Sequence, residues 1–345
     1  HPHPANRDSS TSRGLGDVYK RQGYSIATVS RVLSGKAKGR SQSVYDIVHT
    51  ARDLGYKTSL NQYKDIGIPI DIAVLTQHDA EEFYSCLYES FDRTASQMNI
   101  QISIHSAKHS SNLPEKIHRM SKFHDGIILM APTLESKDYE MILKKISPYP
   151  IISIAPVNGN VLPTITFDSY EGGRLAGEAL IDAGFKRFGV ITGPMVKWEA
   201  NLRKNGFNDA LRKRGYDIDW EFQGDYSFAS GQSAFSNIKK DNSDGMGIFS
   251  SNDQMALGFL HTALENGMKI PGDFGMIGYD NMPYSKVFYP KLSTIDTDLD
   301  LLTKASLNTL NANIRSEKDE RISSTTTLLP VEIVKRRTHT SENSL

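Results

Sequence analysis

Short apolar runs alternate with amphipathic helical stretches along the chain from Asp71 onward. Each run is rich in Ile, Val or Met, and such runs are typical of parallel strands that are buried on both faces. Repeated strand–helix units predict doubly wound parallel sheets, and about 260 residues of them predict two lobes. The strands are predicted at 72–75, 101–105, 126–130, 151–154, 188–192, 247–250 and 276–279.

The helices between these strands follow from the spacing of apolar residues, for example at 83–98, 172–183, 201–214 and 254–266. Gly184 and Gly267 follow two of these helices at the position where glycine commonly ends a helix. A two-lobed protein must also pass its chain between the lobes. We predict these crossings near 154–156, near 279–287 and near 328–330.

A separate pattern precedes the sheets, in residues 23–40 with the sequence GYSIATVSRVLSGKAKGR. Ser25 is a suitable N-cap, and Val29, Val32 and Leu33 then form one apolar helical face. The opposite face carries short side chains and one arginine, so its backbone can approach a nucleic-acid duplex closely. An amphipathic helix that contacts only its own core has the same pattern, so the pattern alone leaves both interpretations open.

The positive charge of this segment favours contact with the phosphate groups of a nucleic acid. Residues 18–45 contain six basic residues and no acidic one, whereas the whole chain has 40 Lys+Arg and 40 Asp+Glu. Another amphipathic helix follows, and we expect Gly55 to end it. Its apolar face is predicted to consist of Val44, Ile47, Val48, Ala51 and Leu54.

Composition excludes several classes of protein. The 345 residues are 38% hydrophobic and 23% charged, which is typical of a soluble globular protein, and we expect a cytoplasmic location without membrane span or signal peptide. Cys86 is the only cysteine, and the ten histidines show no ligand spacing, so we expect no disulfide, metal or cofactor. We find no nucleophile elbow, P-loop or dinucleotide fingerprint, so we expect no enzyme.

The string GYSIATVSRVLSGK closely resembles the recognition-helix segment of the LacI/GalR family of bacterial transcription regulators. Two distant segments are similar to signatures of the same family: SNDQMALG at 251–258, and IGYDN at 277–281 followed by PKLSTI at 290–295. The resemblance covers roughly 15–336 and is weak at 57–71. It implies an α/β fold in which a small, all-α helix-turn-helix domain is joined to a two-lobed periplasmic-binding-protein type 1 domain.

The resemblance implies a repressor that binds double-stranded operator DNA as a homodimer. Ile26, Ala27, Ser30 and Arg31 would enter the major groove, while Ser25 and Thr28 would contact phosphate. The basic loop adds two further candidates for DNA binding, Lys36 and Arg40.

The resemblance also implies a small effector, a sugar or a sugar phosphate, between the lobes. Asn252 and Asp280 follow predicted strands at their carboxyl ends, where open α/β sheets bind ligands. Arg203 lies where the family carries an effector-binding arginine, and Tyr226 lies where some members place an aromatic ring. Phe167 and Tyr84 complete the candidate effector site. The structural alternatives are helix caps at Asn252 and Asp253, a turn at Asp280, a solvated Arg203 and a core Tyr226; Asp168 either lines the cleft or caps a helix.

The sequence departs from the family at three places. Tyr19 and Gln22 stand where small buried residues are usual, residues 57–70 lack the usual hinge pattern, and Ala155 replaces an aspartate of some sugar-binding members. Two alternatives therefore stay open: a sugar-sensing module with impaired DNA binding, and a transporter's solute-binding protein. The expected domains are a non-native tail at 1–14, the helix-turn-helix at 15–56, a hinge at 57–70, an effector-binding and dimerisation domain at 71–337, and a disordered tail at 338–345.

Overall fold

The structure is a computed structural model that describes residues 18, 23–34, 36–37, 41–54, 69–77, 81–107, 112–147, 149–157, 159, 161–238, 245–316 and 324–340. Several sequence predictions lie outside these residues: the tails at 1–14 and 341–345, Tyr19 and Gln22, Arg40, Gly55, and most of the hinge.

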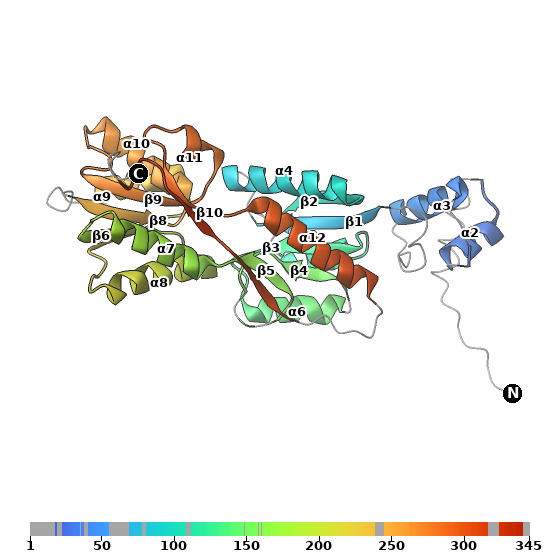
Figure 1. The fold of residues 1–345 in the computed structure, drawn as a ribbon. Coiled ribbons are helices and arrows are strands. Elements are labelled where there is room, and N and C mark those ends of the chain that lie inside the picture. Colours follow the sequence, from blue (N-terminus) through green and yellow to red (C-terminus); the bar gives the residue numbers. More distant parts are fainter. Residues whose placement is uncertain are drawn as a thin grey trace.

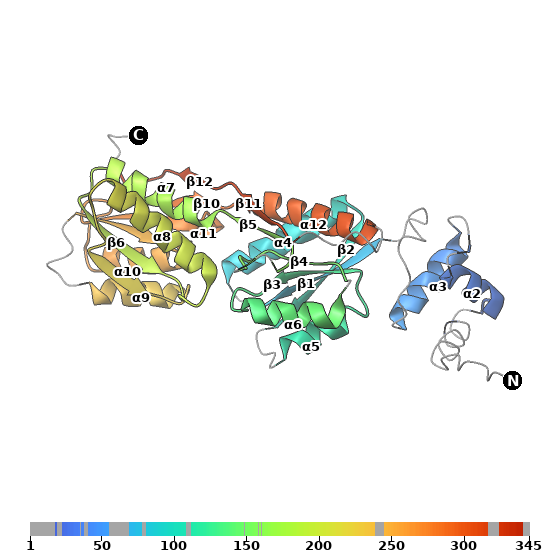
Figure 2. The same ribbon diagram turned by 90° about the horizontal axis from the view of Figure 1, so that it is seen from below.

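The first lobe is built on a parallel sheet with helices on both faces. Within the described residues this sheet has six strands in the order β11-β5-β4-β3-β1-β2. Figure 2 shows α4 and α12 on one face and α5 and α6 on the other. The strands are β1 (Ile70–Thr76), β2 (Ile100–Ser106), β3 (Gly126–Met130), β4 (Ile151–Ser153), β5 (Thr164–Phe167) and β11 (Thr326–Leu329). The helices are α4 (Glu82–Gln97), α5 (Leu113–Met120), α6 (Ser136–Ile146) and α12 (Leu299–Arg315).

The second lobe repeats this architecture. In the described part of the chain its sheet has six strands in the order β12-β10-β9-β8-β6-β7, and only the β10–β12 pair of these is antiparallel. The strands are β6 (Arg187–Thr192), β7 (Trp220–Gln223), β8 (Met246–Ser250), β9 (Phe274–Asp280), β10 (Ser293–Asp296) and β12 (Glu332–Val334). The helices are α7 (Ser169–Asp182), α8 (Trp198–Lys213), α9 (Phe228–Asn237), α10 (Asp253–Glu265) and α11 (Pro283–Val287).

All the strands and helices predicted from the repeating pattern are present, with ends shifted by up to three residues. Gly184 and Gly267 follow the C-caps of α7 and α10 with φ of 96° and 77°, which confirms the predicted helix ends. The sequence did not predict β5, β7, β10, β11 and β12. These strands have only three or four residues each, and several carry hydroxyl or charged side chains.

Two of the three predicted crossings between lobes are wrong. The chain does not cross at 154–156, because β4 and β5 pair in the same first sheet, and it crosses instead between Phe167 and Ser169. Nor does it cross at 279–287, because β9 and β10 pair in the second sheet; the crossing follows Asp296 and leads into α12. The third crossing, between β11 and β12, confirms the prediction near 328–330 (Figure 1).

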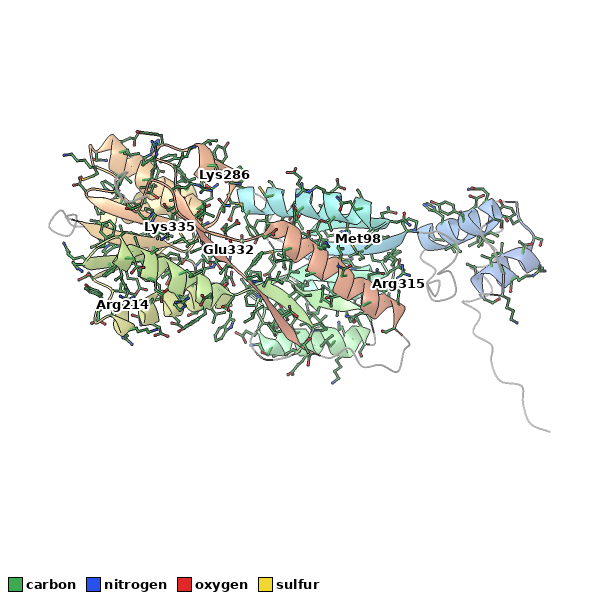
Figure 3. The ribbon with its side chains drawn as sticks, in the orientation of Figure 1. Met98, Arg214, Lys286, Arg315, Glu332 and Lys335 are labelled. Carbon is green, nitrogen blue, oxygen red and sulfur yellow. The ribbon has the colours of Figure 1, made fainter. Side chains whose placement is uncertain are left out.

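The helices α4 and α12 pack side by side in the first lobe. Both begin beside the second lobe and run to the far end of the first, where Met98 and Arg315 lie (Figure 3). Ser90 donates a hydrogen bond to Asp300 at 2.5 Å, and Thr94 and Thr303 are bonded at 3.1 Å. The first residue of α4, Glu82, accepts hydrogen bonds from Gln254 and Tyr284 of the second lobe.

The predicted disordered tail from 338 onward is wrong for residues 338–340. Thr338 is fully buried in the second lobe, where its hydroxyl donates to the Met276 carbonyl and accepts from the Ser293 amide. His339 is also buried and lies 2.8 Å from the Ser293 hydroxyl. This segment packs against β9 and β10 rather than extending away from the second lobe.

A small helical unit lies beyond the first lobe, on the side away from the second (Figures 1 and 2). It contains α2 (Ile26–Leu33) and α3 (Gln42–Asp53). The two helices share a core with Val18, and the Tyr24 hydroxyl donates to Asp46 at 3.0 Å. The buried residues of this core include six that the sequence placed on the apolar faces of the two helices: Val29, Val32, Val44, Ile47, Val48 and Ala51.

Candidate functional site

A cleft lies between the two lobes, with a volume of about 730 Å³ that includes solvent at its opening. The cleft brings together all six effector-site candidates from the sequence, Tyr84, Phe167, Arg203, Tyr226, Asn252 and Asp280. Asp168 is not among its lining residues, because its carboxylate caps α7 by accepting from the Glu171 amide at 2.9 Å.

The two walls of the cleft differ in character. The first lobe contributes mainly apolar surface, with Glu81 as its one charged residue among those described. The second lobe contributes the other four charged residues of the described lining. The first-lobe residues are Glu81, Phe83, Tyr84, Met130, Pro132, Ile154, Ala155, Pro156, Thr166, Phe167 and Leu302. The second-lobe residues are Ser169, Lys197, Glu199, Arg203, Tyr226, Asn252 and Asp280.

Arg203 is held rigidly in the second-lobe wall. Its guanidinium lies 3.6 Å from the centroid of the Tyr279 ring and donates to the Ser251 carbonyl. The Tyr279 ring in turn packs on Gly172 of α7, where an added Cβ would lie 2.6 Å from Cε2 of the ring. Close packing of α7 therefore fixes the tyrosine that supports the arginine, and Arg203 is not a solvated surface charge.

Asp280 ends β9 in a strained backbone conformation. Its φ is 104° and that of Asn281 is 54°, and strained residues of this kind cluster at ligand sites. Burial raises the pKa of Asp280 to about 7, although the guanidinium of Arg203 opposes this rise. The Arg203 Nη2 lies 3.8 Å from Asp280 Oδ1, so the pair is close without direct hydrogen-bond contact.

Asn252 both caps a helix and lines the cleft. Its Oδ1 accepts from the Met255 amide and caps α10, and its Nδ2 donates to the Tyr226 carbonyl. The neighbouring Asp253 is buried outside the cleft lining and binds the Met282 amide and the Thr294 hydroxyl. The cap predicted as the structural alternative is thus real for Asn252, whereas Asp253 braces the turn after β9.

Tyr226 is buried at the cleft wall rather than in a distant core. Its ring packs against Gly193, where an added Cβ would lie 2.1 Å from Cζ. Lys197 Nζ lies 4.7 Å from the ring centroid. Tyr226 itself has a φ of 76°, so its backbone is in the left-handed region that tyrosine rarely adopts.

Three polar atoms of this wall are buried and, within the described residues, have no hydrogen-bond partner: Arg203 Nε, Glu199 Oε2 and Tyr226 OH. Buried polar atoms are nearly always hydrogen-bonded in folded proteins, and an unpaired one costs free energy. A polar ligand in the cleft can supply the missing partners. This is the strongest physical indication that the cleft is a binding site.

Sequence reasoning missed three charged residues of the cleft, Glu81, Lys197 and Glu199. Glu199 precedes Arg203 by four residues on α8, so the two lie on one helical face, and this spacing was the available signal. Burial raises the pKa of Glu199, while Arg203 and Lys197 oppose the rise. Burial also lowers the pKa of Lys197.

The second candidate site is the exposed face of α2. Ser25 caps the helix as expected, accepting from the Thr28 amide at 3.2 Å. Ile26 is 57% exposed at the start of the helix, an unusual position for a large apolar side chain. The remaining described candidates on this face and in the loop, Ala27, Ser30, Arg31 and Lys36, are exposed, and Thr28 is partly exposed.

The described residues contain no cluster of three or more His, Cys, Asp or Glu arranged to hold a metal ion. None of the helices in the described part of the chain combines the length and apolar character needed to span a membrane.

Comparison with known proteins agrees with this architecture. Residues 178–339 match the family model of the periplasmic binding protein-like domain. The chain is 27% identical to the HTH-type transcriptional repressor PurR of Mannheimia succiniciproducens over 319 residues, covering 89% of this chain and 93% of that protein.

Two solved structures are also similar. The Lac repressor dimer bound to operator and the anti-inducer ONPF has a TM-score of 0.73 at 25% identity, covering 95% of this chain and 99% of that one. A LacI family transcriptional regulator from Enterococcus faecium with bound ribose has a TM-score of 0.68 at 25% identity, covering 78% of this chain and 98% of that one.

The fold and the two sites together define a regulator with a small helical DNA-binding unit and a two-lobed, periplasmic-binding-protein-like domain for a small ligand. The similarity to a PurR repressor, to the Lac repressor and to a LacI family regulator bears out the resemblance to the LacI/GalR family of bacterial transcription regulators. Its relatives are transcriptional repressors rather than enzymes.

Proposed function

We propose that this protein represses transcription by binding operator DNA through α2 and that a small polyhydroxyl effector in the interlobe cleft controls this binding. The observation that carries the proposal is the cleft itself. It joins an apolar wall from one lobe to a wall with three unpaired buried polar atoms from the other.

The proposed contacts to DNA use the exposed face of α2. Ile26, Ala27, Ser30 and Arg31 face the edges of bases in the major groove, where an exposed apolar side chain can contact a thymine methyl group. Ser25 and Thr28 at the helix start, with Lys36 after it, contact phosphate. A homodimer would present two such helices to two half-sites. The Lac repressor, to which the chain is similar, is a dimer bound to operator in its solved structure.

The proposed effector is sugar-like because the cleft has two unlike walls. A pyranose or furanose ring offers apolar C–H groups to Phe83 and Phe167 of the first lobe, and hydroxyl groups to the polar wall. Arg203 and Asp280 supply a donor and an acceptor to neighbouring hydroxyls. The Enterococcus faecium regulator, whose structure contains ribose, supports this class of ligand.

The two sites are linked through the angle between the lobes. An effector that contacts both walls favours one lobe arrangement, and a dimer converts this arrangement into a spacing of its two α2 helices. By thermodynamic linkage, operator binding then changes effector affinity by the same factor. DNA binding also implies that the protein works in the cytoplasm.

The DNA site is tested with promoter DNA from beside the coding sequence, in a gel shift at fixed salt concentration. Arg31→Ala is expected to weaken operator binding and to leave effector binding unchanged. Arg212→Ala, which removes an exposed charge from the second lobe, is the matched control. Equal operator affinity for wild type and Arg31→Ala would refute the assignment of α2.

The effector site is tested by a thermal-shift screen across sugars, followed by calorimetry with the best ligand. Arg203→Ala is expected to abolish both the thermal shift and the release of operator. An unchanged calorimetric isotherm for this variant would refute the cleft as the effector site.

A further inference from the structure

The ionisable groups of the cleft are not balanced in charge. The described lining carries three carboxylic acids, Glu81, Glu199 and Asp280, but only two basic groups, Lys197 and Arg203. All five belong to residues that line the same open cleft. Burial raises the pKa values of Glu199 and Asp280, so a positively charged group on a ligand would stabilise the ionised form of either acid.

Both cations make contacts within the protein, although Arg203 Nε has no hydrogen-bond partner among the described residues. Arg203 contacts the Ser251 carbonyl, the Tyr279 ring and, at 3.8 Å, the Asp280 carboxylate. Lys197 is only 8% exposed and lies over the Tyr226 ring.

Glu199, in contrast, is not satisfied by the protein. Its Oε2 is buried and has no hydrogen-bond partner in the described part of the chain. No ion pair within 4.0 Å joins it to the described lysine and arginine side chains, although Lys197 and Arg203 lie two and four residues away on the same helical segment. The carboxylate accepts a hydrogen bond from its own backbone, so it is Oε2 that needs a donor, and a ligand in the cleft can supply one.

We infer that the effector carries an amino group that binds the Glu199 carboxylate, and that this residue makes the cleft select an amino sugar over the parent sugar and over a sugar phosphate. The inference rests on the proposed function, since it concerns the same cleft. It narrows the expected class, which also included sugar phosphates, to polyhydroxyl compounds with a positive charge.

The physical reason is the difference between the donors. A hydroxyl supplies one neutral hydrogen bond to the carboxylate, whereas an ammonium group supplies up to three donors and cancels the buried charge. A phosphate supplies only acceptors at neutral pH and adds negative charge beside three acids. The gain of a charge-assisted bond over a neutral one corresponds to an affinity ratio of about tenfold.

The experiment uses the full chain and three matched sets of probes: glucose, galactose and mannose, each with its 2-amino derivative and its 6-phosphate. Thermal shift selects the best set, and calorimetry at neutral pH then measures the three affinities. The proteins are wild type, Glu199→Gln and Asp217→Asn. Asp217 is an 84%-exposed carboxylate of the second lobe, so its substitution removes the same charge away from the cleft.

For wild type and Asp217→Asn we expect the amino sugar to bind about tenfold more tightly than its parent, and the phosphate to bind more weakly than the parent. For Glu199→Gln we expect the ratio of amino sugar to parent to fall close to one while the parent sugar still binds. Retained binding of the parent shows that the variant is folded.

Three results would overturn the inference: an amino sugar that gains nothing over its parent in wild type, a phosphate that binds more tightly than its parent, or a ratio that Glu199→Gln leaves unchanged. In each case, binding of any parent sugar together with release of operator leaves the proposed function intact. If no probe binds, the inference for this class of ligand is wrong, and the gel shift separately decides the proposed regulator function.

Discussion

Asp280→Asn is expected to stabilise the effector-free protein while abolishing its response to effector. Asp280 is 6% exposed, and burial raises its pKa from the ordinary value of 3.8 to about 7. Asparagine has the same shape, carries no charge and tolerates the positive φ of 104° as well as aspartate does. The substitution therefore removes an unfavourable buried charge without disturbing the backbone.

The magnitude follows from proton linkage. Between pH 3.8 and about 7 the unfolded chain loses the Asp280 proton while the folded protein keeps it, so the free energy of unfolding falls as pH rises through this window. Below 3.8 both states are protonated, and above about 7 both are ionised and the loss is complete. At about 1.36 kcal/mol per pH unit, the full loss is about 4 kcal/mol.

The assay is urea unfolding of the effector-free protein at a series of pH values from below 3.8 to above 7. The measured quantity is the unfolding free energy of Asp280→Asn minus that of wild type. Burial also raises the pKa values of Glu199 and Asp253, but both proteins contain these groups, so their contributions largely cancel. Loss of the carboxylate near Arg203 adds an offset that is nearly independent of pH.

We expect the difference to grow by about 4 kcal/mol from the acidic to the alkaline end of the series, in favour of the variant. Asp217→Asn, at an exposed position, is the control and should give a flat difference. A flat difference for Asp280→Asn as well would refute the buried, high-pKa carboxyl group and the electrostatic description of the cleft.

Three further predictions concern packing and coupling. Gly206→Ala should destabilise the protein by more than about 3 kcal/mol in thermal unfolding, because its Cβ would lie 1.9 Å from the Tyr170 carbonyl oxygen. Gly272→Ala is the control and should cost much less, because its Cβ would approach only Lys269 Cβ, at 3.2 Å. Ile47→Ala, in the core of the small helical unit, should cost about 2–4 kcal/mol there and weaken operator binding in a gel shift, with calorimetric effector affinity unchanged. Glu82→Ala removes two hydrogen bonds that join the lobes, from Gln254 at 3.3 Å and from the Tyr284 amide at 3.1 Å. Effector affinity should therefore fall by up to about tenfold. Equal calorimetric isotherms for variant and wild type would show that these bonds do not contribute to closure of the lobes.

Much of the fold was predictable because its signals are local. The apolar runs of β3 and β9 need only their own composition to indicate buried parallel strands, and Gly184 ends α7 through its own backbone freedom. The cap at Ser25 and the apolar face of α2 were visible in one helical turn of sequence. The spacing of motifs placed Asn252 and Asp280 at strand ends, where ligands bind in such sheets.

The lobe crossings could not be predicted in the same way. β5 and β10 are four-residue strands that contain threonine and, in β10, serine and aspartate, so their local pattern resembles a loop. Only pairing with β4 and β9 shows that they belong to the sheets and moves both crossings downstream. The burial of Thr338 likewise depends on Met276 and Ser293, which are distant in sequence.

The sequence by itself determined the alternation of strands and helices, the apolar faces of the small helical unit and the residues that resemble a family's effector site. Each of these depends on neighbours within a few positions along the chain. Only the tertiary structure decided that Glu199 Oε2 has no partner among the described residues, that Arg203 rests on Tyr279, and that an apolar wall faces both. Those properties arise from burial and from contacts between distant segments, because the free energy of a charge depends on what surrounds it in space.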